Sequence, residues 1–324
     1  MAVQLNNRAL VTIYGGSGFL GRHVVRAIAR TGARMRVAVR RPHLAGHLQP
    51  LGDVGQIVPV QANVRFPDSL VTAAEDADAV INLVGILFPT GKQTFKSVQD
   101  EGARNVAEAA KAAGARTFVH LSAIGADADA PSAYARTKAA GEAAVKEIFP
   151  EAVIFRPSIV FGPEDDFFNR FAALARMSPV LPLIGGGRTK FQPVFVGDVA
   201  HAIVAALKGR AGHDAPYELG GPEILTMRDV MQRVLDYSMR QRLLMPLPFW
   251  MAKLQAFFLQ LLPKPPLTVD QVRLLQKDNV VSEEAIKAGR TLEALGIDPV
   301  AVASIVPDYL EQFRPRGQFS DYKP

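Results

Sequence analysis

The stretch ALVTIYGGSGFLG (residues 9–21) decides the fold class. Its first half, Ala9–Tyr14, is a run of apolar and β-branched residues that predicts a buried strand. Its second half spaces Gly15, Gly18 and Gly21 three residues apart, where the strand gives way to a helical pattern. Glycines at these places suit a tight turn, a close approach of backbone N–H groups to a pyrophosphate, and close helix–strand packing. A glycine trio is weak evidence alone, but in this position it predicts a dinucleotide-binding βαβ unit.

The alternation of strand and helix continues along the chain to about residue 156. Strands are expected at 9–14, 36–39, 57–61, 79–84, 117–122 and 152–156. Ala-rich helical stretches lie between them, at 18–31, 68–75, 97–113 and 133–149. Crossovers of this length join parallel strands, so the sequence predicts an α/β fold with a doubly wound parallel sheet of the NAD(P)-binding Rossmann type.

After Arg156 the rhythm breaks into a stretch rich in proline and glycine, before another expected strand at Phe191–Val196 and a helix at Val199–Leu207. We therefore expect a smaller C-terminal α/β region that interleaves with the first. The predicted division assigns residues 1–160 and 190–210 to the Rossmann domain and residues 161–189 and 211–324 to the smaller domain.

Composition narrows the chemistry. The 324 residues include no cysteine, which excludes disulfides, iron–sulfur clusters and cysteine nucleophiles, and the six histidines show no ligand spacing. No metal site is expected. A net charge of +6 from scattered basic residues is a weak signal, and no nucleic-acid module is recognisable. The first residues lack the pattern of a signal peptide and no long apolar run is present, so we expect a bacterial cytoplasmic setting without a transmembrane helix.

The residues after the second expected strand bear on the choice of cofactor. An acidic residue there would bind the ribose 2′-hydroxyl of NAD, but this chain has Arg40 and Arg41. Guanidinium groups match phosphate oxygens, so the pair favours the 2′-phosphate of NADPH. The alternative is two solvated surface arginines.

A second motif places Tyr134 and Lys138 four residues apart at the start of an Ala-rich helix, so both side chains share one face. A nearby ammonium group lowers the pKa of a phenol toward neutrality, which predicts a general acid or base. The alternative for Tyr134 is an ordinary buried hydroxyl. For Ser122, a role in the site and an ordinary serine at the end of a strand are equally favoured.

These features together resemble the short-chain dehydrogenase/reductase superfamily, in its extended and atypical branch, through about residue 235. The resemblance implies that Asn63 contacts adenine, that the segment Asn82–Gly85 lies behind the cofactor, that Lys138 holds the nicotinamide ribose, and that Tyr134 donates a proton. Ser122 would supply the active-site hydroxyl, unless Ala123 occupies that position. The implied cofactor-binding set is Gly15, Gly16, Ser17, Gly18, Phe19, Leu20, Gly21, Arg40, Arg41, Asn63, Val64, Leu83, Val84, Gly85, Tyr134, Lys138 and Pro157.

Within this superfamily, the segment His47–Ile57 and the runs 123–133, 155–168 and 192–196 resemble the NADPH-binding accessory subunits of respiratory complex I, the NADH:ubiquinone oxidoreductase. That resemblance implies NADPH held tightly as structure, away from the main electron path. It also implies partners among complex I subunits near the junction of the peripheral and membrane arms, on the cytoplasmic side of the inner membrane. The alternative is a working NADPH-dependent reductase or epimerase acting on a carbonyl or nucleotide-sugar substrate, with loops 161–171 and 181–191 around its pocket.

The segment LLMPLPFWMAKLQAFFLQLL (residues 243–262) predicts a helix from 248 to 262 that is apolar nearly all round. Such a helix is buried, docked on a partner, or laid in a bilayer interface. Flanking Arg240, Arg242 and Lys264 suit anionic lipid headgroups. The alternative is a lid over a substrate pocket of the chain itself. The tail from Gln312 to Pro324 shows no helical pattern.

Overall fold

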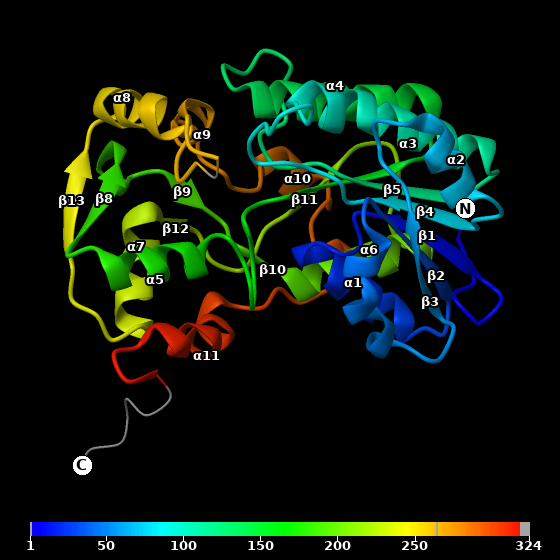
Figure 1. Ribbon diagram of the computed structural model, residues 1–324, viewed down its shortest axis with the longest axis horizontal. Coiled ribbons are helices and arrows are strands. Elements are labelled where there is room, and N and C mark those ends of the chain that lie inside the picture. The colour runs from blue at the N-terminus through cyan, green and yellow to red at the C-terminus, as the bar shows by residue number, and fades with distance from the viewer. Residues whose placement is uncertain (1, 264, 318–324) are drawn as a thin grey trace. The chain divides into compact units, whose positions relative to one another are not determined.

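The computed structural model describes residues 2–263 and 265–317 (Figure 1). Lys264 and the end of the tail, residues 318–324, lie outside the described residues. The chain divides into two compact units and passes between them several times. Unit 1 contains residues 1–157, 197–218 and 284–297, and unit 2 contains residues 158–196, 219–283 and 298–324.

Unit 1 is built on a seven-stranded sheet in the order β11-β6-β5-β4-β1-β2-β3. The neighbouring strands from β1 to β6 pair in parallel. The bounds are β1 (Leu10–Tyr14), β2 (Arg34–Val39), β3 (Ile57–Gln61), β4 (Ala79–Asn82), β5 (Thr117–Leu121), β6 (Val153–Pro157) and β11 (Tyr217–Leu219). The doubly wound sheet expected from the sequence is confirmed.

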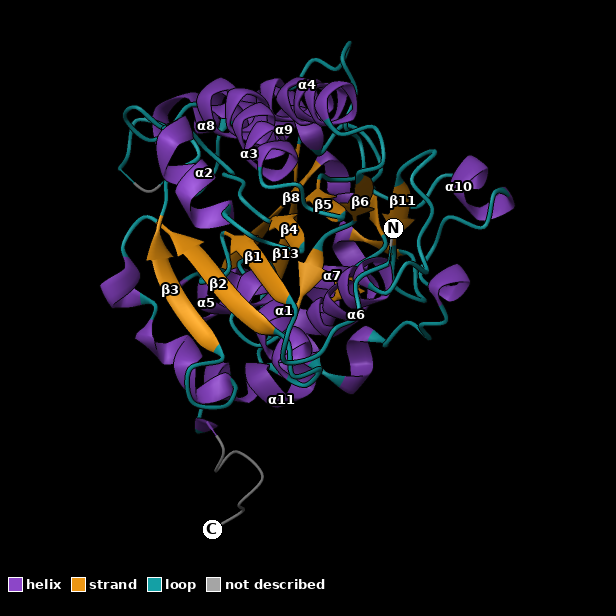
Figure 2. Ribbon diagram, turned by 90° about the vertical axis from the view of Figure 1, so that its right-hand side faces the viewer, coloured by secondary structure: helices purple, strands orange, loops and turns teal. Residues whose placement is uncertain are grey.

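Helices cover both faces of this sheet (Figure 2). They are α1 (Phe19–Ala29), α2 (Pro67–Ala74), α3 (Glu101–Ala112), α4 (Ala133–Ile148) and α6 (Val196–Leu207). A further short helix is α10 (Glu283–Lys287). A π-helical turn at Lys96–Asp100 leads into α3. Helices α2, α3 and α4 share one face, over a core that includes Val80, Phe118 and Val145. The strand order reverses between β1 and β4, so the carboxyl ends of these two strands flank the crevice where such sheets bind ligands.

Unit 2 consists of short strands and helices. Its three two-stranded sheets pair β7 (Val160–Phe161) with β10 (Val194–Phe195), β9 (Lys190–Phe191) with β12 (Leu225–Thr226), and β8 (Val180–Ile184) with β13 (Leu243–Leu247). Its helices are α5 (Phe168–Met177), α7 (Met227–Tyr237), α8 (Phe249–Leu259), α9 (Val269–Leu274) and α11 (Val306–Leu310). None of the helices described in either unit is long and apolar enough to cross a membrane.

One expected strand is wrong. The sequence pattern joined residues 191–196 into a single strand, whereas the structure ends β9 at Phe191 and starts β10 at Val194. β9 pairs antiparallel with β12, and β10 pairs parallel with β7. Pro193 has no N–H group to continue a ladder, and the N–H of Gln192 donates to the carbonyl of Asn279 (3.1 Å).

Candidate dinucleotide-binding site

The turn between β1 and α1 has the backbone shape of a phosphate cradle. Gly15 adopts a φ of +82°, in the left-handed region that suits glycine. A Cβ on Gly21 would lie 2.5 Å from the carbonyl oxygen of Gly15 and 2.5 Å from the carbonyl carbon of Gly16, so only glycine fits this approach of α1 to the turn. The N-terminal N–H groups of a helix carry partial positive charge. α1 begins at Phe19 with no acidic residue in its first turn, so no side-chain carboxylate there compensates this charge.

The segment after β4 lies against this cradle. The N–H of Leu83 donates to the carbonyl of Tyr14 (3.0 Å), and the side chain of Asn82 accepts from the N–H of Val84 (3.1 Å). A Cβ on Gly15 would lie 3.3 Å from the backbone nitrogen of Val84. The structure therefore brings together the two segments that the sequence assigned to one cofactor site.

Arg40 and Arg41 follow β2 directly, and both are exposed. Arg40 donates a hydrogen bond to the side-chain oxygen of Gln93, in the loop that leads from β4 to α3. Asn63 follows β3 in the same way, and its side-chain oxygen accepts from the N–H of Arg65 (3.2 Å). Asn105 of α3 holds the carbonyl of the buried Val64 (2.8 Å). All four residues that the sequence predicted here therefore follow the carboxyl ends of β2 and β3.

Tyr134 and Lys138 lie one turn apart on α4, whose N-terminus is capped by Ser132. The ammonium of the buried Lys138 donates to the carbonyl of Leu121 at the end of β5 (3.2 Å). It lies 6.0 Å from the centre of the Tyr134 ring, and 3.4 Å from where a Cβ on Gly85 would be. Lys138 thus joins the helix to the loops after β4 and β5.

The electrostatics differ from the sequence-based prediction. Burial lowers the pKa of Lys138 to about 8, although the Glu142 carboxylate acts in the opposite direction. Burial also raises the pKa of Tyr134 to about 12. The prediction that the ammonium brings this phenol toward neutrality is therefore wrong for this structure, because burial disfavours the charged phenolate.

Two buried polar atoms at the end of β5 have no hydrogen-bond partner among the described residues. They are Oγ of Ser122 and Nε2 of His120. His120 pairs through Nδ1 with the side chain of Asn82 (3.2 Å). Burial, with the Lys138 ammonium as the second cause, lowers the pKa of His120 to about 3, so the ring is neutral at pH 7. An orphaned buried hydroxyl normally has an external partner, which makes Ser122 Oγ a point where a bound molecule would be held. Ala123 is half-buried, and Pro157 is buried at the end of β6, where its carbonyl accepts from Ile124 (3.0 Å).

Sequence reasoning missed Gln99, which lies in the π-helical turn before α3. Its buried amide donates to the carbonyl of Ile86 (2.9 Å) and accepts from the hydroxyl of Thr137 on α4 (2.9 Å). It therefore ties the segment that follows Gly85 to the helix that carries Tyr134 and Lys138. A glutamine three residues before Gly102 gave no signal of this role, because the contacts depend on the π-helical turn.

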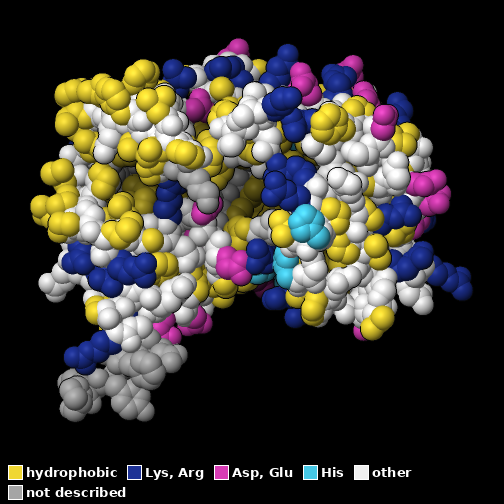
Figure 3. Space-filling model, in the orientation of Figure 1, with side chains coloured by type: hydrophobic (Ala, Val, Ile, Leu, Met, Phe, Trp, Pro, Cys, Tyr) yellow, Lys and Arg dark blue, Asp and Glu magenta, His cyan; other side chains and the backbone are white. Residues whose placement is uncertain are grey.

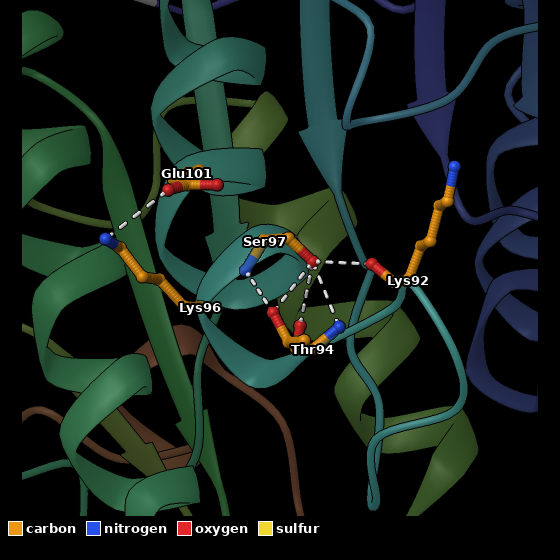
Figure 4. Close-up of polar contacts among 5 residues, drawn as sticks. All are labelled: Lys92, Thr94, Lys96, Ser97 and Glu101. Atoms are coloured by element: carbon orange, nitrogen blue, oxygen red, sulfur yellow. Dashed lines mark hydrogen bonds and ion pairs between the residues drawn. The ribbon is translucent and has the colours of Figure 1, made fainter.

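The start of that turn is held by a reciprocal pair of hydrogen bonds (Figure 4). The N–H of Thr94 donates to Ser97 Oγ, and the N–H of Ser97 donates to Thr94 Oγ1, both at 3.0 Å. Ser97 Oγ also contacts the carbonyl of Lys92 (3.2 Å), and Lys96 pairs with Glu101 (3.6 Å). These local contacts fix where the π-helical turn starts, and so where Gln99 points.

The residues present fit a dinucleotide. The glycines of the cradle carry no side chains that would keep a phosphate away from the backbone N–H groups. Ser122 Oγ, which has no partner among the described residues, offers a hydroxyl, and Lys138 lies beside the exposed Gly85. Together the fold and this site define an NAD(P)-binding Rossmann protein. A model of the NAD dependent epimerase/dehydratase family matches residues 11–220, and the chain belongs to this family.

Individual relatives within the family indicate a narrower class of protein. The chain is 35% identical over 320 residues to the mitochondrial NADH dehydrogenase (ubiquinone) 1 alpha subcomplex subunit 9 of Arabidopsis thaliana, covering 95% of this chain and 79% of that protein. It is 30% identical to the mitochondrial NADH-ubiquinone oxidoreductase 40 kDa subunit of Neurospora crassa, covering 95% and 80%. A ceramide reductase of Caulobacter vibrioides is 38% identical over 61% of this chain and 61% of its own length. The resemblance to complex I accessory subunits, expected from the sequence, is confirmed.

Solved structures agree on the fold. An NADPH-dependent quinone oxidoreductase of Escherichia coli, complexed with NADPH, superposes with a TM-score of 0.73 at 19% identity, covering 93% of this chain and 99% of that one. A dTDP-glucose 4,6-dehydratase of Streptomyces venezuelae with NAD bound superposes with a TM-score of 0.71 at 17% identity, covering 97% and 99%. At this identity the likeness shows the fold, which accommodates either dinucleotide.

Proposed function

We propose that this chain is an NADPH-holding accessory subunit of respiratory complex I. The observation that carries the proposal is the similarity to complex I subunits over 95% of the chain, which includes unit 2 as well as the Rossmann sheet. In this proposal the protein is peripheral on the cytoplasmic side of a bacterial inner membrane. It contacts complex I subunits near the junction of the peripheral and membrane arms, with anionic lipid as a second contact.

The nucleotide has a structural task in this proposal. NADPH would lie with its pyrophosphate over residues 15–21, its 2′-phosphate between Arg40 and Arg41, and its nicotinamide ribose at Lys138. The backbone of the cradle supports the first contact, and the exposed guanidinium groups after β2 support the second.

The test is native isolation of membranes in mild detergent, followed by size separation and mass spectrometry of the protein and its bound nucleotide. We expect the chain to migrate with complex I and to carry NADPH that neither exchanges nor oxidises while NADH turns over. Migration as a small species with exchangeable nucleotide would overturn the proposal.

A matched pair of variants tests the nucleotide separately. Arg40→Ala/Arg41→Ala should reduce the preference for NADPH over NADH at least about tenfold, because two phosphate-binding forks are lost. Arg30→Ala, which removes an exposed arginine just after α1, should leave the preference unchanged. Equal affinities for the two nucleotides in the unaltered protein would remove NADPH from the proposal.

A reductase is the second candidate, favoured by the intact Tyr134 and Lys138 and by the orphaned Ser122 Oγ. Bound NADPH would supply a hydride to a carbonyl carbon. Tyr134 would then donate its proton to the carbonyl oxygen, and Ser122 Oγ would hold that oxygen. Oxidation of the bound nucleotide by an added ketone, abolished by Tyr134→Phe, would establish this candidate over the first.

A further inference from the structure

The helix α8 buries small side chains and exposes large apolar ones, the opposite of a typical surface helix. Its buried residues are the small Ala252 and Ala256, one turn apart, which pack in a cluster with Val272 of α9. Phe249 and Leu259 at its ends are half-buried, but five large apolar side chains between them are exposed: Trp250 (67%), Met251, Leu254, Phe257 and Phe258 (62%). Side chains at such a spacing form a stripe along one side of a helix, and water-exposed stripes of this kind mark a docking surface.

The apolar surface extends beyond the helix. Leu261 and Leu262 after α8 are exposed, as are Leu243 and Met245 of β13, which pairs only with β8 among the described strands. Figure 3 shows hydrophobic side chains gathered over α8 and β13. We call this surface, formed by the exposed apolar residues from 243 to 262, the apolar face.

The apolar face is anchored to the neighbouring elements of unit 2. The ring of Phe249 lies directly over Gly185, which leaves no room there for a Cβ, and all five residues of β13 are in register with β8. Such anchoring argues against a loose lid and for a surface preformed to meet a partner.

Charge identifies the partner. Residues 237–269 contain no aspartate or glutamate, but they contain Arg240, Arg242, Lys253 and Lys264. Arg240 and Arg242 lie just before β13. Arg240 Nε donates to the carbonyl of Phe313 (2.8 Å), and the guanidinium of Arg176 lies over the Phe313 ring (5.9 Å). Arg242 Nε donates to the carbonyl of Ala175 (2.7 Å), so three guanidinium groups gather at one end of the apolar face. An apolar stripe bordered by basic groups is the pattern of a surface that enters the interface of an anionic bilayer.

We infer that the apolar face docks on an anionic phospholipid bilayer, with α8 lying in the interface and Arg176, Arg240 and Arg242 at the phosphate level. With 11 residues, α8 is about 16 Å long, which suits a helix lying in the interface. The inference rests on the proposed function only for its setting, since it names the surface through which the subunit would contact the membrane.

The chain carries its own reporter, because Trp250 is its single tryptophan. Purified full-length protein is mixed with vesicles of phosphatidylcholine alone, or of equal parts phosphatidylcholine and phosphatidylglycerol. We expect a blue shift of Trp250 fluorescence and quenching by brominated lipid with the anionic vesicles, and a much weaker response with the neutral ones. The response should fall as salt is added, because the arginines act through screened charge.

Two sets of variants separate the apolar term from the charged one. Phe257→Gln/Phe258→Gln should lower the vesicle partition coefficient at least tenfold, whereas Ile286→Gln, an equally exposed apolar residue on α10, should leave it unchanged. Arg240→Gln/Arg242→Gln should lower it by about fivefold for each charge lost. Arg240→Lys/Arg242→Lys keeps the charge and should restore binding, even though both side chains lose part of their hydrogen bonds to the carbonyls of Phe313 and Ala175.

Two results would overturn the inference. If Trp250 does not respond to anionic vesicles while the chain still migrates with complex I, a protein subunit covers the apolar face. If the free chain forms a dimer that Phe257→Gln/Phe258→Gln dissociates, a second copy covers it. Vesicle binding without migration with complex I would support this inference and contradict the proposed function, so the two can fail separately.

Discussion

Replacing the buried Lys138 should stabilise the nucleotide-free protein and weaken its binding of the nucleotide. The pKa of Lys138 falls from its ordinary 10.5 to about 8 because burial disfavours the ammonium. At about 1.4 kcal/mol per unit of pKa shift, keeping this side chain charged costs the folded state about 3 kcal/mol at neutral pH. Lys138→Met removes that cost but leaves the carbonyl of Leu121 without its donor, a loss of about 1 kcal/mol. We expect a net gain of about 2 kcal/mol in the free energy of unfolding.

The pH dependence gives a second signature. Between pH 8 and 10.5 the unfolded chain keeps a proton on Lys138 that the folded chain has lost, so the unaltered protein becomes more stable as pH rises through this range. Urea unfolding of nucleotide-free protein at pH 7 and pH 9.5 measures the effect, which Lys138→Met should reduce; a smaller dependence remains because burial also lowers the pKa of Lys146. Lys111→Met, at an exposed position on α3, serves as the control and should change neither value. A destabilised Lys138→Met protein, or an unchanged pH slope, would refute the reasoning.

Three further substitutions, two of them paired with a control variant, test the packing of unit 1. Gly21→Ala places a Cβ 2.5 Å from the carbonyl oxygen of Gly15 and should cost about 3 kcal/mol in thermal unfolding, whereas Gly46→Ala, with no atom within 4 Å, should be nearly neutral. Glu142→Ala leaves the half-buried Arg156 without its two-pronged partner (2.9 and 2.6 Å) and should cost about 3 kcal/mol, and a cost below about 1 kcal/mol would contradict this. Glu147→Ala on the same helix breaks an exposed pair with Arg104 and should cost less than about 1 kcal/mol by urea unfolding. Asn82→Leu removes the hydrogen-bond partners of His120 Nδ1 and of the Val84 N–H and should cost about 2 kcal/mol by urea unfolding; an unchanged free energy of unfolding would contradict this.

The Rossmann sheet could be predicted because its signals are local. Each strand of unit 1 from β1 to β6 is a short apolar run bounded by turn residues, and each crossover is long enough to be one element. The cradle could also be predicted, because glycines spaced like Gly15, Gly18 and Gly21 at a strand–helix junction have few other physical uses. The structure accordingly places Gly15–Gly21, Leu83–Val84 and Lys138 together as the sequence indicated.

Other features depend on contacts between distant residues. The break between Phe191 and Val194 follows from their separate partners β12 and β7, which no local pattern specifies. The pKa of Tyr134 is raised by burial in the folded chain, whereas its spacing to Lys138 pointed only to a nearby positive charge, which would lower that pKa. The link from Gln99 to Ile86 and Thr137 exists because a π-helical turn directs that amide toward both.

By itself the sequence determined the doubly wound sheet, the dinucleotide cradle, the arginine pair after β2 and the kinship with complex I subunits, since these depend on residue type and short-range spacing. It also showed that residues 243–262 are apolar nearly all round, but such a helix could equally have been buried. Only the tertiary structure decided that Ala252 and Ala256 face inward while Trp250 and Phe258 face out. The physical reason is that a helix without an apolar–polar asymmetry carries no sequence signal for its inner face, so the small side chains that let α9 approach closely make the choice.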